Sequence, residues 1–266
     1  MGRADEITGA MRYAAKVDNA RFIMDKYKAG YKIINAGSDG RGFFKMMKSA
    51  YGMELKILYR DTDICVVQKE PGMLCEDAPG GIPPLLRAQL QTDYAAVVHR
   101  LDAGTGGAMV FALNKNAAGK LSLQLQAGEF AKTYLAVTHG CPPEREGIYR
   151  DLLFHDRRAN KTFVVKNERK GVKEAVMSYR IKACADGLSL WEIQLLTGRT
   201  HQIRVQLGSR KMPLVGDRRY GARDAYKGLA LWAKELSFCH PQSEQRLTFT
   251  CLPEYKEPWD RFVKQD

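Results

Sequence analysis

The sequence lacks the features of a membrane-spanning or exported protein. Nowhere in its 266 residues does an apolar run reach the roughly 18 residues that a transmembrane helix needs. The beginning of the chain, MGRADEITGAMRYAAKVDNA, contains no apolar stretch of signal-peptide length. Glu6 stands where a myristoylation pattern requires serine or threonine. We therefore expect a cytoplasmic protein with no membrane partner.

The sequence also lacks cysteines at the spacing of a metal site or a disulfide-rich module. It has six, which are scattered: Cys65, Cys75, Cys141, Cys184, Cys239 and Cys251. Thiols in a cytoplasmic protein stay reduced, so we expect six free cysteines. Such spacing does not favour a structural zinc site made from them and the five histidines, and we expect no metal.

A phosphate-binding glycine loop is absent as well. Gly104, Gly106 and Gly107 precede an apolar run, whereas the glycines of a nucleotide-binding loop follow a strand. GTGG also does not match the pattern G-x-x-x-x-G-K-S/T. These glycines are better suited to bringing a backbone or a ligand close to the loop.

What the chain has is positive charge. The formal net charge is +12 and the isoelectric point is about 9.4, a balance that favours anionic partners and above all nucleic acid. The densest basic segments are 150–173 and 216–227. This spread favours an extended surface that contacts phosphates, although a merely basic surface has the same composition.

Two regions differ in pattern. Residues 1–50 have the pattern of a helical extension of unknown role, with a loop or linker at 36–42. The same segment could equally be part of the main core. Residues 51–266 form the second region, in which strands dominate and hairpins are frequent. We expect an α+β domain with a mixed, mostly antiparallel sheet and flanking helices.

Local signals predict the elements of this domain. Two short strands flank the turn at 61–63, a buried strand covers 107–113, another strand covers 131–140, and a hairpin turns at 185–187. One helix begins near Pro83 and ends near Gln91, and a second begins after Asn114 and ends near residue 126. A third short helix has Thr200 as its expected N-cap and Gly208 after its end.

Asp102 is the first candidate for chemistry. A single acid in a loop is more often a turn residue or a helix cap than a catalytic group. Here, however, Arg100 lies two residues earlier and a rigid buried strand follows. A nearby arginine keeps a carboxylate ionised, so Asp102 is a candidate nucleophile or base.

The segment LLTGRTHQIRVQL (195–207) is the second candidate. A strand, a turn and a helix start would place Arg199 and free backbone amides at an anion site, although a capped helix with a solvated arginine is the simpler alternative. A third candidate is Tyr134, which shares one strand face with Lys132. A core tyrosine is the usual interpretation of such a residue, and a tyrosine that stacks on a nucleobase is the functional one.

At these positions the chain resembles the RluA-type pseudouridine synthases. HRLDAGTGG resembles the family's H-R-L-D-x-x-T-S-G signature, KTYLAV its K-x-Y motif, and LLTGRTHQIRVQL its T-G-R-x-H-Q-I-R segment. ILYRDTDICVVQKEPGML, PLVGDRRYG and LALWAKELSFCHP are similar to further family motifs, in the same order, between residues 55 and 253. The resemblance implies an RNA-modifying isomerase with a pseudouridine synthase fold.

The resemblance implies that a uridine in structured RNA, ribosomal or transfer, is converted to pseudouridine without cofactor or metal. Asp102 would be the essential acid, as nucleophile or as base, and Arg199 would pair with it. Tyr134 would stack against the flipped base or also take part in proton removal at C5, and Arg100 would fill the space that the base leaves or hold the displaced strand. Residues expected to contact RNA are Arg100, His99, Lys132, Thr200, His201, Gln202 and Arg204. We expect a monomer.

Three positions depart from the family pattern. Gly106 stands where serine is usual, Trp232 replaces a small residue or histidine, and Glu70 interrupts the Lys-Pro-Gly turn. Two alternatives are a non-catalytic RNA-binding protein with the same fold and a glycosidase. The second lacks the additional carboxylate of a two-acid mechanism.

Overall fold

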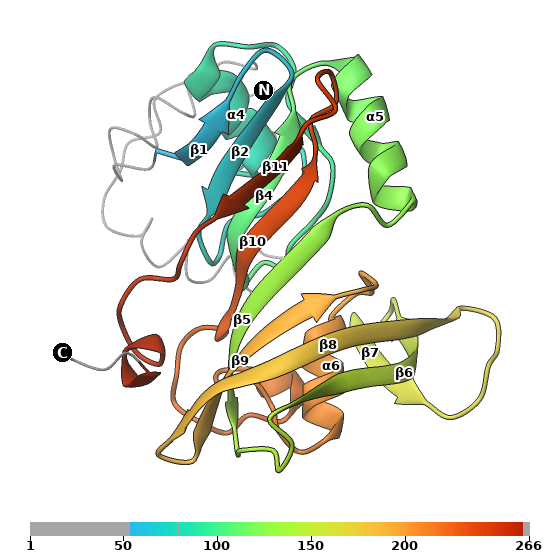
Figure 1. Ribbon diagram of the computed structural model, residues 1–266, viewed down its shortest axis with the longest axis vertical. Helices are drawn as coiled ribbons and strands as arrows, with labels where there is room; N and C mark the ends of the chain where they lie inside the picture. The colour runs from blue at the N-terminus through green and yellow to red at the C-terminus, as the bar shows by residue number, and fades with distance from the viewer. Residues whose placement is uncertain (1–53, 79, 263–266) are drawn as a thin grey trace, which may run out of the picture.

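A computed structural model describes residues 54–78 and 80–262 of the chain (Figure 1). The helical extension and linker predicted within residues 1–50 lie outside this range. Across the described residues, no helix has the length and apolar character needed to cross a membrane.

One continuous sheet of 11 strands runs through the described part of the chain. Its order is β1-β2-β4-β10-β5-β9-β8-β6-β7, with β3 paired to β4 and β11 to β10. The strands are β1 Lys56–Arg60, β2 Ile64–Lys69, β3 Ala96–Val97, β4 Gly106–Ala112, β5 Ala131–His139, β6 Glu146–Asp156, β7 Lys161–Val165, β8 Val172–Ala185, β9 Leu188–Leu195, β10 Leu231–Cys239 and β11 Arg246–Thr250.

Helices lie against this sheet in both halves of the molecule (Figure 1). In Figure 1, α4 (Ile82–Leu90) and α5 (Lys115–Gln126) flank the upper strands, and α6 (Gln202–Ser209) lies beside the lower ones. Two short 3₁₀ helices complete the elements, Arg218–Tyr220 and Trp259–Phe262. The predicted α+β architecture is confirmed.

The sheet is mixed because β4 and β10 run parallel, whereas the other described strand pairs are antiparallel. The parallel contact is short and joins Gly106 to Trp232 and Gly107 to Ala233. β4 is buried along its whole length, which explains its continuous apolar sequence. The loop that contains Asp102 leads directly into this contact.

Several local predictions are confirmed. Asn114 caps α5, because its side-chain oxygen accepts a hydrogen bond from the Ala117 backbone N–H at 2.9 Å. Pro83 lies in the first turn of α4, where its missing N–H costs no helical hydrogen bond. Asp186 and Gly187 turn the β8–β9 hairpin with φ values of 51° and 74°, as a tight primed turn requires.

The predicted caps of the third helix are wrong. α6 begins at Gln202, and its N-cap is His201 in the left-handed conformation with φ 55°. The Gln202 side-chain oxygen accepts hydrogen bonds from the Thr197 hydroxyl at 2.8 Å and the Arg199 backbone N–H at 3.0 Å. These hydrogen bonds close the turn before α6 and give the Arg199 N–H an acceptor, so that no cap by the Thr200 side chain is needed. Gly208 lies inside α6 rather than after it.

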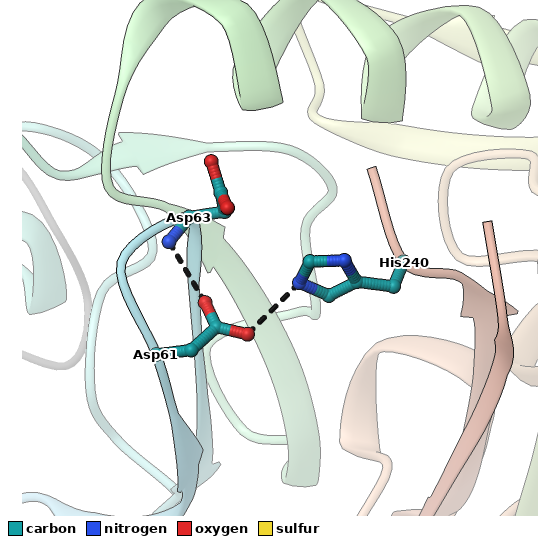
Figure 2. Close-up of side chains that lie close together, drawn as sticks. All are labelled: Asp61, Asp63 and His240. Atoms are coloured by element: carbon teal, nitrogen blue, oxygen red, sulfur yellow. Dashed lines mark hydrogen bonds and ion pairs between the residues drawn. The ribbon is translucent and has the colours of Figure 1, made fainter. Parts of the chain in front are cut away.

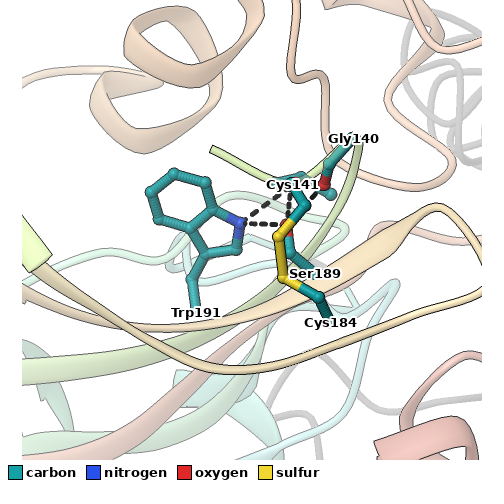
Figure 3. Close-up of a disulfide and its surroundings, with 6 residues drawn as sticks. Gly140, Cys141, Cys184, Ser189 and Trp191 are labelled. Carbon is teal, nitrogen blue, oxygen red and sulfur yellow. Dashed lines mark hydrogen bonds between the residues drawn. A yellow bond between two sulfur atoms is a disulfide. The ribbon is translucent and has the colours of Figure 1, made fainter. Parts of the chain in front are cut away.

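The expectation of six free cysteines is also wrong, because Cys141 and Cys184 form a disulfide (Figure 3). They are 43 residues apart in sequence, but β9 pairs with both β5 and β8, which brings their Cα atoms to 6.2 Å. The Ser189 hydroxyl beside the disulfide donates to the Gly140 carbonyl and accepts a hydrogen bond from the Trp191 indole. The remaining cysteines of the described chain are free.

Candidate active site

Lys69, at the end of β2, holds the loop that contains Asp102. Its side chain is fully buried, and its Nζ donates to the carbonyls of Glu70 at 3.2 Å, Ala103 at 2.9 Å and Thr105 at 2.8 Å. Burial lowers the pKa of Lys69 to about 8. Two of the three carbonyls lie one and three residues after Asp102, so the ammonium group fixes the backbone on which the candidate catalytic acid stands.

Gly106 and Trp232, two of the departures from the family pattern, compensate for one another. They are register partners on β4 and β10, and a Cβ atom at position 106 would lie 2.2 Å from Cζ3 of the Trp232 indole. The indole therefore occupies the space that a serine side chain would take. Gly107 is required for a different reason: its φ is +123°, and a Cβ there would meet the Ala233 backbone at 2.2 Å.

Arg204, in the first turn of α6, pairs with Asp102. Its Nη1 donates to Asp102 Oδ2 at 3.0 Å, while Nε and Nη2 donate to the two carboxylate oxygens of Asp217 at 2.7 and 2.8 Å. Burial disfavours the charged guanidinium, but the hydrogen bonds and charges of Asp217 and Asp102 raise the pKa of Arg204. The Asp102 side chain keeps 26% of its exposure, so an ordered carboxylate remains within reach of a ligand.

Arg199 does not pair with Asp102, which corrects the sequence prediction. Its Nε donates to the backbone carbonyl of Glu174 at 2.8 Å, along β8. Since the helix begins only at Gln202, Arg199 belongs to the preceding turn. Arg204 stands on the helical turn that faces Asp102. The expected arginine partner is therefore present, five residues further along the chain.

Tyr134 lies on β5 with 7% of its surface exposed, within the main apolar cluster. Burial, and secondarily the charge of Asp102, raise the pKa of the Tyr134 hydroxyl. The tyrosine is therefore protonated at neutral pH, and its pKa is sensitive to the charge of Asp102.

His201 is the second side chain near the carboxylate. Its Nε2 lies 3.8 Å from Asp102 Oδ2, and its Nδ1 shares a hydrogen bond of 2.9 Å with the Tyr220 hydroxyl. That hydroxyl also accepts the Thr162 backbone N–H at 2.8 Å. Burial is the main cause that lowers the pKa of His201 to about 4.

Two of the predicted RNA contacts lie in the protein interior. His99 is 5% exposed and its Nε2 accepts the Val110 backbone N–H at 3.3 Å, while Gln202 is 2% exposed and ties the Thr-Gly-Arg turn together. Neither side chain is at the surface, which corrects their assignment as RNA contacts. Burial also lowers the pKa of His99. Instead, His99 bonds to strand β4, and Gln202 holds the turn before α6.

The other predicted contacts differ in accessibility. Arg100 has a 69% exposed side chain that pairs with Glu76 at 2.6 Å, and Thr200 is exposed. Lys132 is partly buried, with its Nζ 5.7 Å from the centre of the Phe130 ring. Burial lowers the pKa of Lys132 to about 8.

Reasoning from the sequence missed the roles of Lys69, Asp217 and Tyr220. All three stand within the segments KEPG and GDRRYG that carry the family resemblance, but periodicity and spacing assign them no contact with Asp102. Asp217 is 2% exposed, and a buried acid needs a partner, here Arg204. Their motifs were visible, whereas their partners depend on the tertiary structure.

Asp61, Asp63 and His240 form a cluster of potential metal ligands (Figure 2). Hydrogen bonds within the protein are enough to explain why these three side chains lie close together. His240 Nδ1 accepts the backbone N–H groups of Gln242 and Ser243, which leaves Nε2 to donate to Asp61 Oδ2 at 2.8 Å. The other Asp61 oxygen accepts the Asp63 and Ile64 backbone amides. The cluster joins the β1–β2 turn to the end of β10.

A basic groove of about 630 Å³ begins beside Thr200 and runs between the β6–β7 hairpin and the Thr-Gly-Arg turn. It is lined by four cationic side chains: Arg157, Arg158, Lys173 and Arg199. Within residues 54–78 and 80–262, no ion pair connects any of the four to a carboxylate. With Asp156 as the carboxylate in its lining, the groove presents an excess of positive charge, and its His155 ring lies 6.2 Å from that of His201.

Comparison with known proteins identifies the class. Over residues 63–209 the sequence matches the family described as RNA pseudouridylate synthase. The chain belongs to this family, as an RNA pseudouridine synthase of the RluA type, and is therefore an isomerase.

Relatives and solved structures agree with this family. An uncharacterised RNA pseudouridine synthase of Bacillus subtilis strain 168 is 34% identical over 216 residues, which cover 76% of this chain and 70% of the relative. Ribosomal large subunit pseudouridine synthase C of Buchnera aphidicola subsp. Baizongia pistaciae is 32% identical, covering 75% and 67%. The structure of human RNA pseudouridylate synthase domain containing 1 superposes with a TM-score of 0.66 at 25% identity, covering 78% of this chain and 86% of the human one.

Proposed function

We propose that this enzyme converts a specific uridine of structured RNA to pseudouridine, with Asp102 as the essential group and without a cofactor. The observation that carries the proposal is the geometry of Asp102: a partly exposed carboxylate held by Arg204, which Asp217 holds in turn. Ribosomal and transfer RNA are both candidate substrates. The relative from Buchnera, ribosomal large subunit pseudouridine synthase C, favours ribosomal RNA.

The chemistry needs few groups because the reaction is an isomerisation. The N1–C1′ bond of the uridine breaks, a C5–C1′ bond forms, and the proton leaving C5 is balanced by one gained at N1, so no co-reactant is consumed. Asp102 acts on the target nucleotide as a nucleophile or a base, for which it must be ionised. Arg204 orients it through the hydrogen bond from Nη1 to Asp102 Oδ2 at 3.0 Å. Tyr134, protonated and buried on β5, would form a wall against which the base lies.

The target base has to leave its stack before it reaches Asp102, which costs a few kcal/mol. Contacts to phosphates offset this cost. We place the RNA backbone along the basic groove, whose cations lack carboxylate partners in the described chain. Arg100 is exposed and lies two residues before Asp102 in the chain, and we assign it to the strand from which the base is displaced.

Salt dependence tests the groove. Replacing Arg157 and Arg158 with alanine should flatten the slope of log affinity against log salt by about 1–2, since each phosphate contact contributes about 0.7–0.9. Arg180→Ala is the matched control, because Arg180 is equally basic and exposed but pairs with Glu146 outside the groove. An unchanged slope in the double variant, or an equal change in the control, would exclude this path for the RNA.

The activity itself is tested with RNA labelled with tritium at uracil C5. Purified full-length protein and total RNA from cells that lack the gene should release tritium at one site, which mass spectrometry of RNase fragments then locates. Release of free uracil would instead indicate a glycosidase. Binding without tritium release on ribosomal and transfer RNA would indicate a non-catalytic RNA-binding protein.

A further inference from the structure

His201 is held in place beside Asp102 but does not bond to it. Its Nε2 is 3.8 Å from Asp102 Oδ2, beyond hydrogen-bond distance, and its side chain is 9% exposed. Its backbone is in the left-handed region at the start of α6, and the hydrogen bond between Nδ1 and the Tyr220 hydroxyl holds its ring. Among the described residues, Nε2 has no closer polar partner.

The other ring nitrogen indicates which tautomer is present. The Tyr220 hydroxyl accepts the Thr162 N–H, and its single proton has one acceptor in good geometry within the described chain, His201 Nδ1 at 2.9 Å. The Thr162 hydroxyl proton is committed to the Thr200 carbonyl at 2.9 Å. If Nδ1 accepts, the proton of a neutral imidazole is on Nε2, the nitrogen that faces Asp102.

We propose that His201 is a neutral Nε2–H donor to a carbonyl oxygen of the target uracil, and that Tyr220 is the positioning residue that sets this tautomer. The inference rests on the proposed function. When the N1–C1′ bond breaks, its electron pair passes to the uracil ring and negative charge grows on the carbonyl oxygens. A fixed donor then bonds more strongly in the transition state than in the ground state, and no proton leaves the histidine.

The surroundings of the ring favour the neutral form. Burial has the largest effect, and the charges of Arg204 and Arg219 act in the same direction, whereas Asp102 and Asp217 favour the imidazolium. Two rings lie at an edge-on angle to the imidazole: that of Tyr220, at 5.7 Å between centroids, and that of His155, at 6.2 Å. An imidazolium at this position would pair with Asp102 and weaken the carboxylate as a nucleophile or base.

The tautomer is tested without RNA. In ¹⁵N spectra of histidine-labelled full-length protein at pH 7, His201, assigned through the His201→Gln variant, should show the Nε2–H pattern. In Tyr220→Phe the donor to Nδ1 is lost, so the protonation midpoint of His201 should rise. A wild-type Nδ1–H pattern, or an unchanged midpoint in the variant, would overturn the role of Tyr220 whether or not the protein is active.

The donor is tested by kinetics with C5-tritiated RNA. His201→Met and His201→Gln have side chains of the same length, but only glutamine retains an N–H donor. Met should lower kcat about 100-fold with little change in KM, and Gln should recover most of that loss. Equal kcat in the two variants would overturn the proposal. If wild-type protein forms no pseudouridine, the proposed function fails, and the donor role fails with it, while the ¹⁵N result still decides the tautomer.

Discussion

Replacing Gly106 with serine, the residue usual in the family, should destabilise this particular protein. The new Cβ would lie 2.2, 2.6 and 3.0 Å from three atoms of the Trp232 indole, all well inside van der Waals contact. The indole cannot withdraw freely, because it is 4% exposed and its Nε1 donates to the Cys251 carbonyl at 3.0 Å. Overpacking of a core costs about 1–3 kcal/mol, and a lost buried hydrogen bond about 1 kcal/mol more.

We therefore expect Gly106→Ser to lower the free energy of unfolding by about 2–4 kcal/mol, measured by urea denaturation. Gly119→Ser is the matched control: position 119 lies in α5 with nothing within 4 Å of an added Cβ, so its stability should change by less than about 1 kcal/mol. The pair is isolated by a double-mutant cycle with Trp232→Ala. In that background the serine should cost at least about 1 kcal/mol less. A Gly106→Ser protein as stable as wild type, or an additive cycle, would refute the compensation between these two positions.

Three further predictions concern the supports of the site and of the fold. Lys69→Met removes three hydrogen bonds but also a buried charge, so the free energy of unfolding should fall by only about 1–3 kcal/mol. Tritium release should drop roughly tenfold or more, because the loop that carries Asp102 is no longer held in place. Wild-type activity in this variant would contradict the role of Lys69 in placing the loop. Cys141→Ser should lower the free energy of unfolding by up to about 4 kcal/mol in non-reducing urea titrations, the loop-closure value for a separation of 43 residues. Under dithiothreitol, which reduces the disulfide of the wild type, the two proteins should be equally stable. Since burial lowers the folded-state pKa of both His99 and His201, the unfolded chain binds more protons below about pH 6.5, and stability should decrease from pH 7 towards pH 4; a higher urea midpoint at pH 5 than at pH 7 would contradict this.

The parts of the fold that the sequence predicts are those set by neighbouring residues. An apolar run between turn signals predicts the buried strand β4, Asn114 predicts the start of α5, and Asp186–Gly187 predicts the hairpin. In each case the decisive contacts lie within a few residues of the pattern. The same holds for Asp102, whose glycine-rich loop and following strand are local features.

The features that the sequence does not predict join distant segments. Which arginine meets Asp102 depends on where α6 begins and which way its first turn faces, so residues 199 and 204 cannot be distinguished by residue type. The disulfide depends on the order of β5, β9 and β8 in the sheet. Gly106 and Trp232 look like two unrelated departures until the parallel contact of β4 and β10 makes them partners.

Asp102→Asn tests most directly whether Asp102, held by Arg204, performs the isomerisation. Asparagine preserves the size of the side chain and an oxygen for Arg204 but cannot act as a nucleophile or base. Asp93→Asn, at an exposed position on another loop, is the control. We predict that Asp102→Asn binds RNA within a few-fold of wild type and releases no tritium from C5-labelled uridine, while the control is fully active. Tritium release by purified Asp102→Asn at a rate near that of wild type would contradict the account.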